Sequence, residues 1–83
     1  MQKRILILGG GTSHVPIIKI ANEIGLYTIA MDKNPVAEGL KIARKGLNLD
    51  GGNRDEVLKV AQNEKVHGIL ATGDYSVIPA AYA

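Results

Sequence analysis

The chain has 83 residues, enough for one small domain, and 46% of them are hydrophobic, which is ordinary for a folded protein. Its net charge is only +2 and it has just three aromatic residues, so a nucleic-acid surface built on a basic stripe or on base stacking is not expected. The absence of cysteine excludes disulfides, thiolate metal ligands and a cysteine nucleophile. The first apolar run is four residues long, too short for a signal peptide or a membrane span, so a cytoplasmic protein without a membrane anchor is expected.

The segment ILILGGGTSH, near the start of the chain, carries the clearest signal. Four apolar residues lead directly into three glycines and two hydroxyl residues. This order predicts a buried parallel strand at 4–8, a tight turn, and a helix over 12–24 with Thr12 or Ser13 as its N-cap and Gly25 after its end. The unpaired N–H groups and the dipole of such a helix favour an anion beside the glycines.

The middle of the chain predicts a strand, a short helix and another strand. The second strand covers 27–31. Asn34 is followed by proline, which is typical of a helix start, so a helix is expected over 36–44. Gly39 inside that helix weakens the prediction. A third strand follows at 46–49.

The last third predicts a turn and a helix, then a strand and a second turn. Asn53 is the expected N-cap of the third helix, with Glu56 in the capping-box position. The expected buried face of this helix consists of Val57, Leu58, Val60 and Ala61. A fourth strand at 68–71 leads through a turn at 72–74 into a further helix that has no stop signal. From that missing signal we expect 1–83 to be one domain at the front of a longer protein.

Alternating strands and helices of this length predict an α/β fold, a Rossmann-like three-layer sandwich around a parallel sheet. Right-handed crossovers give the four strands the order 3-2-1-4. Ligands in such folds bind beyond the carboxyl ends of the strands at the switch point, here between the first and fourth strands. The loops 9–13 and 72–76 are expected to meet there.

The glycine turn matches only part of the dinucleotide fingerprint G-x-G-x-x-G, because Gly9 and Gly11 are followed by His14 in place of the third glycine. A histidine there is expected to push the helix away or to turn toward solvent. An anion-binding loop remains, unless the glycines serve only the bend. His14 is a candidate to contact an anionic ligand or move a proton, or else a partly exposed residue of the first helical turn.

Two carboxylates follow strands at the ligand-binding end of the predicted sheet. Asp32 lies where a ribose-binding carboxylate belongs, or it caps the turn that follows. Asp74 is a candidate to bind an amine or hydroxyl, or with Ser76 to cap the fourth helix. His67 begins the fourth strand, at the end away from His14, and is expected to be structural, so no shared metal site is expected. The sequence contains no H-E-x-x-H, G-x-S-x-G or Walker motif, and no catalytic set is predicted.

Four segments in order, ILILGGGTSH, AMDKNPVAEGLKIA, RDEVLKVAQNEKVHGIL and TGDYSVIPAAYA, resemble the N-terminal (pre-ATP-grasp) domain of ATP-grasp enzymes. The resemblance is greatest to carbamoyl-phosphate-synthase-like enzymes and phosphoribosyl-type carboxylate–amine ligases, and DKNPVA and VIPAAYA are its most specific parts. It implies an enzyme that uses ATP and Mg²⁺ to activate a carboxylate as an acyl phosphate, which an amine then attacks. The ATP and metal ligands belong to a later ATP-grasp domain, in the same or a separate chain, so this chain alone is expected to be inactive and to hold no cofactor.

The resemblance also implies which residues face a small anionic or carboxylate substrate: Gly10, Gly11, Thr12, Ser13, Asp74 and Tyr75. His14 departs from many relatives, which have a small residue at that position. Two alternatives stay open, a nucleotide-sensing regulatory module of the potassium-transporter type and an NAD-binding oxidoreductase domain. A homodimer is a further option.

Overall fold

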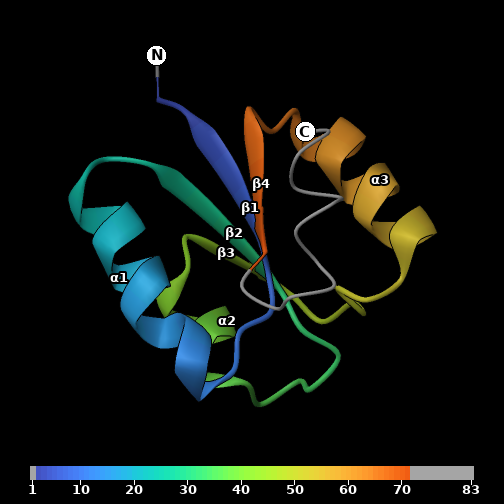
Figure 1. Cartoon of the computed structure of the whole chain (residues 1–83), viewed down its shortest axis with the longest axis horizontal. Helices are drawn as coiled ribbons and strands as arrows, with labels where there is room; N and C mark the ends of the chain where they lie inside the picture. Colours follow the sequence, from blue (N-terminus) through green and yellow to red (C-terminus); the bar gives the residue numbers. More distant parts are fainter. Residues whose placement is uncertain (1, 72–83) are drawn as a thin grey trace.

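The computed structural model describes residues 2–71, which form a single parallel sheet with helices on both faces (Figure 1). The strand order is β3-β2-β1-β4, so the predicted order 3-2-1-4 and the Rossmann-like α/β class are confirmed. The strands are β1 Arg4–Leu8, β2 Tyr27–Met31, β3 Lys45–Leu47 and β4 Gly68–Ala71. The helices are the 3₁₀ turn η1 Thr12–His14, α1 Val15–Glu23, α2 Glu38–Ile42 and α3 Arg54–Glu64.

Two apolar clusters, one on each face, hold the three layers together. In Figure 1, α1 and α2 lie on the left of the sheet and α3 lies on the right. Since successive strand residues point to opposite faces, β1 sends Leu6 and Leu8 toward the α3 side and Ile7 toward the α1 side. Val57 and Val60 of α3 complete the first cluster. The apolar runs of the two central strands are thus buried on both faces, as the sequence predicts.

The first helix begins differently from the prediction. Thr12 and Ser13 lie inside η1 rather than before it, and neither the N-cap of η1, Gly11, nor that of α1, His14, makes a side-chain cap bond. The His14 N–H instead donates to the Gly11 carbonyl at 2.9 Å, which closes the 3₁₀ turn. The hydroxyl N-cap prediction is therefore wrong. The end of the helix is as predicted, because Gly25 has a φ of 90°.

The second helix is shorter than predicted, because a turn takes its first residues. The Asn34 side chain accepts from the Val36 N–H at 3.1 Å, and its carbonyl accepts from the Ala37 N–H at 3.0 Å. This local turn delays α2 to Glu38–Ile42. The third strand correspondingly starts and ends before the predicted 46–49.

The third helix is capped as predicted but buries a narrower face. The Asn53 side chain accepts from the Glu56 N–H at 3.2 Å. The second bond of a capping box, from the Asn53 N–H to the Glu56 side chain, is not formed, because this N–H donates to the Asp50 carbonyl. Leu58, predicted to be buried, is 49% exposed. The buried residues of α3 are Val57 and Val60, and Ala61 is partly buried against the same cluster. The predicted turn 72–74 and fourth helix lie outside the described residues.

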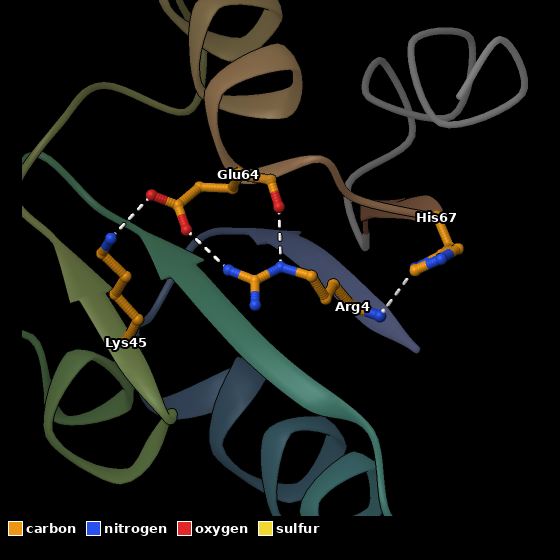
Figure 2. Close-up of polar contacts among 4 residues, drawn as sticks. All are labelled: Arg4, Lys45, Glu64 and His67. Atoms are coloured by element: carbon orange, nitrogen blue, oxygen red, sulfur yellow. Dashed lines mark hydrogen bonds and ion pairs between the residues drawn. The ribbon is translucent and has the colours of Figure 1, made fainter. Parts of the chain in front are cut away.

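An ionic cluster joins three elements at the amino ends of the strands (Figure 2). The Glu64 carboxylate, at the end of α3, pairs with the Arg4 guanidinium at 2.8 Å and the Lys45 ammonium at 2.6 Å. The hydrogen bond from Lys45, aided by both positive charges, lowers the pKa of Glu64 below its ordinary value of 4.5, although partial burial acts against it. His67 Nδ1 accepts from the Arg4 backbone N–H at 2.9 Å, which agrees with a structural role for that histidine.

Candidate functional site

An open cleft of about 220 Å³ lies at the other end of the sheet, beyond the carboxyl ends of β1 and β2. Leu8 and Met31, the last residues of those strands, form its apolar floor. Its polar walls include His14, Asp32, Lys33, Asp50 and Gly51. We call it the carboxyl-end cleft. It brings together the loops after β1, β2 and β3.

Asp32 connects two of these loops through its carboxylate. Its Oδ2 accepts from the Gly10 N–H at 2.9 Å, and its Oδ1 accepts from the Asn34 N–H at 2.8 Å. Partial burial alone would raise the pKa of Asp32, but the two backbone hydrogen bonds, with the nearby His14 and Lys33 side chains, outweigh it and lower that pKa below 3.8. Asp32 is therefore ionised at neutral pH, and its bond to Asn34 agrees with the turn-capping interpretation.

The glycine turn offers fewer N–H groups to an anion than its sequence suggests. The Gly9 N–H donates to the Ile7 carbonyl at 3.1 Å, and the Gly10 N–H is directed at Asp32. Within residues 2–71, the N–H groups of Gly11, Thr12 and Ser13 have no hydrogen-bond partner. These three groups, at the start of η1, are the part of the turn that can face an anionic ligand.

The His14 side chain neither pushes the helix away nor turns fully to solvent. Its imidazole folds back over Gly9, so that a Cβ at Gly9 would lie 2.6 Å from both Cε1 and Nε2. Gly9 also has a φ of 125°, which only glycine adopts readily. The glycine at position 9 thus accommodates the histidine that replaces the third glycine of the fingerprint.

Gly39 in α2 supports the turn from behind, a role the sequence interpretation missed. Its N–H donates to the Gly10 carbonyl at 2.6 Å. A Cβ at Gly39 would lie 2.6 Å from the Gly10 oxygen, 2.7 Å from the Gly10 Cα and 2.8 Å from Cδ1 of Ile18. The available signal was a glycine in an otherwise helical segment, which indicates a close approach of backbone.

The structure brings the predicted site residues together only in part. Gly10, Gly11, Thr12 and Ser13 lie at the turn, next to His14 and Asp32, while Asp74 and Tyr75 lie outside the described residues. The loop after β3 was not predicted to join the site. A Cβ at Gly51 would lie 3.5 Å from the Leu8 Cα, so this loop packs over the end of β1.

Neither a metal cluster nor a membrane helix is present in the described part of the chain. Within residues 2–71, no three His, Asp or Glu side chains are grouped so as to hold a metal ion. Over the same residues, no helix has the length and apolar character needed to cross a bilayer.

The sheet order, the crossover helices and the glycine turn define a Rossmann-like α/β domain. Among solved structures, the chain is similar to phosphoribosylglycinamide synthetase from Anaerococcus prevotii, with 30% sequence identity and a TM-score of 0.79. The match covers 98% of this chain and 21% of that chain, so this chain spans about a fifth of the synthetase. It confirms the resemblance to an N-terminal domain of ATP-grasp ligases. A scan against protein-family models and a search of curated proteins give no match.

Proposed function

We propose that this chain is the substrate-side domain of an ATP-dependent ligase that activates a carboxylate as an acyl phosphate and joins it to an amine. The observation that carries the proposal is the match to phosphoribosylglycinamide synthetase over nearly the whole chain. The match is to a fifth of a synthetase chain, so most of the machinery of such an enzyme belongs elsewhere. In this proposal ATP and Mg²⁺ are held by an ATP-grasp domain in the same or another chain.

The glycine turn supplies the substrate contacts in this proposal. The N–H groups of Gly11, Thr12 and Ser13 and the positive end of the α1 dipole favour a carboxylate or phosphate at the turn. Asp32 holds the turn in this arrangement through the Gly10 N–H. The chain's own residues thus bind and orient an anion, while the phosphoryl chemistry is supplied by the other domain.

A chimaera tests the proposal. In it, this chain replaces the matching fifth of the A. prevotii synthetase, and ATP-dependent formation of phosphoribosylglycinamide is measured. We expect activity above that of the synthetase lacking the segment. Ser13→Asp, which places a negative charge beside the anion-facing N–H groups, should lower that activity by about tenfold, a difference of about 1.4 kcal/mol. Lys59→Gln, on the exposed side of α3, is the matched control and should leave it unchanged.

Two results would contradict the proposal. One is a folded chimaera without ATP-dependent product, and the other is activity that is indifferent to Ser13→Asp. The alternative functions are separated by binding, because a nucleotide-sensing module or an NAD-binding domain should bind AMP or NAD with micromolar affinity as the isolated chain.

A further inference from the structure

We propose that the outer face of α1 is a self-association surface, on which a second copy of this chain packs its own α1 in the antiparallel direction. The apolar part of this surface consists of Pro16, Ile20 and Ile24, which we call the α1 stripe. Pro16 is exposed, Ile20 is 57% exposed and Ile24 is 70% exposed. The sequence left a homodimer as an option but pointed to no surface for one. This inference goes beyond the proposed function and does not depend on it.

Packing within the domain does not account for the α1 stripe. Its residues recur at every fourth position, so they lie one above another along one side of the helix. The buried residues of α1 are Ile18 and Ala21, on the side that faces the sheet. The helix on the other face of the sheet, α3, has exposed residues that are polar apart from Leu58. The apolar outer face therefore distinguishes α1 from α3 and indicates a contact with another molecule.

Two charged residues beside the α1 stripe make this surface complementary to itself. Lys19 and Glu23 are exposed and four positions apart, so they lie on the same flank of the stripe, with Lys19 nearer the start of α1. Neither forms an ion pair with any residue in the described part of the chain. A two-fold axis that lays α1 antiparallel on its copy keeps the two flanks on one side and reverses their direction. Lys19 of each copy then lies beside the partner's Glu23.

A second copy of this chain fits the surface better than a partner of one charge. A basic partner would face Lys19 with a like charge, and an acidic partner would do the same to Glu23, whereas the copy places opposite charges at both positions. The contact is small, because α1 has nine residues and is about 14 Å long. It would bury less than the roughly 800 Å² that each partner contributes to a standard interface. We therefore expect a weak, reversible dimer with a Kd of about 0.1 mM.

Sedimentation velocity and amide NMR spectra of the chain, recorded from about 10 μM to about 1 mM, test the self-association. The sedimentation coefficient should rise with concentration, and the signals that move should be those of α1. Ile20→Glu places a carboxylate from each copy at the centre of the contact and should keep the chain monomeric at about 1 mM. Leu58→Glu, at an exposed apolar position of α3, is the matched control and should leave the dimer unchanged. A chain that stays monomeric at about 1 mM, or shifts confined to other elements, would overturn the proposal.

Charge reversal tests the antiparallel arrangement. Lys19→Glu and Glu23→Lys should each weaken self-association about tenfold, because two like-charge pairs replace two opposite-charge pairs. An equimolar mixture of the two variants should regain the affinity of the unaltered chain, because each reversed position then faces an opposite charge on the other copy. Like charges within one helix are the same in the mixture and in the separate variants, so the recovery reports the contact between copies. If both variants are folded by circular dichroism and the mixture associates no better than either alone, the arrangement is refuted.

Discussion

Replacing Gly39 with alanine tests whether α2 holds the glycine turn in place. The new Cβ would lie 2.6 Å from the Gly10 oxygen and 2.7 Å from the Gly10 Cα, so backbone must move rather than a flexible side chain. Overpacking of this kind costs about 1–3 kcal/mol. Loss of the 2.6 Å bond from the Gly39 N–H to the Gly10 carbonyl adds about 1 kcal/mol. Alanine gains up to about 1 kcal/mol in helix propensity, which leaves a net loss of about 1–3 kcal/mol.

Urea and thermal unfolding followed by circular dichroism measure this loss. For a domain of this size each kcal/mol lowers Tm by about 4–8 °C. Gly68→Ala is the matched control, because a Cβ there meets no atom of residues 2–71 within 4 Å, and its stability should stay within about 1 kcal/mol of the unaltered chain. If Gly39→Ala were as stable as the unaltered chain, helix propensity would outweigh the contact, and α2 would not support the turn.

Three further predictions concern a cap, a charge cluster and the turn. Asn53→Ala should lower the free energy of unfolding by about 1 kcal/mol, because the α3 cap is lost. The control Asn63→Ala, at an exposed position of the same helix, should change this free energy by less than about 0.5 kcal/mol. Equal effects of the two substitutions would refute the role of Asn53 as a cap. Glu64→Gln should cost about 1–2 kcal/mol at pH 7. Because the folded-state pKa of Glu64 is lowered, this difference in the free energy of unfolding is present above pH 4.5 and should shrink as the pH falls below that value. Urea unfolding measured at a series of acidic pH values tests the prediction. A difference that stays constant with pH would contradict it. Inorganic phosphate should shift the amide signals of Gly11, Thr12 and Ser13 first, and larger shifts elsewhere would argue against the turn.

The sheet could be predicted from the sequence because its signals are local and agree with one another. Each central strand is a short apolar run that ends at a glycine or an aspartate, and β1 and β2 have the predicted bounds. Short connections and right-handed crossovers then leave one strand order. The third helix followed from Asn53, whose cap uses a side chain and an N–H three residues apart. These strands and this helix cap depend on residues only a few positions apart, so they can be predicted from the sequence.

The errors occurred where groups distant in the sequence decide the local conformation. Judged by helix propensity alone, Gly39 weakens its helix. The structure needs a glycine there because the Gly10 backbone lies too close for a Cβ, and the two residues are 29 positions apart in the sequence. His14 was expected to push the helix away, to turn toward solvent or to be a partly exposed residue of the first turn. It is partly exposed in η1, and what the sequence did not predict is that Gly9 makes room for its ring. The Asn34 side chain could cap a helix or close a turn, and in the structure it closes a turn by accepting from the Val36 N–H. None of these outcomes follows from the composition of a single segment.

The glycine turn is held from one side of the sheet, and this limits how a ligand can move it. Asp32 accepts from the Gly10 N–H, and Gly39 donates to the Gly10 carbonyl, so both polar groups of one residue are bound by the β2–α2 region. Any shift of Gly10 must therefore move that region or break one of these bonds. An anion at Gly11 would act on N–H groups next to this fixed residue, so the turn is expected to keep its shape when an anion binds.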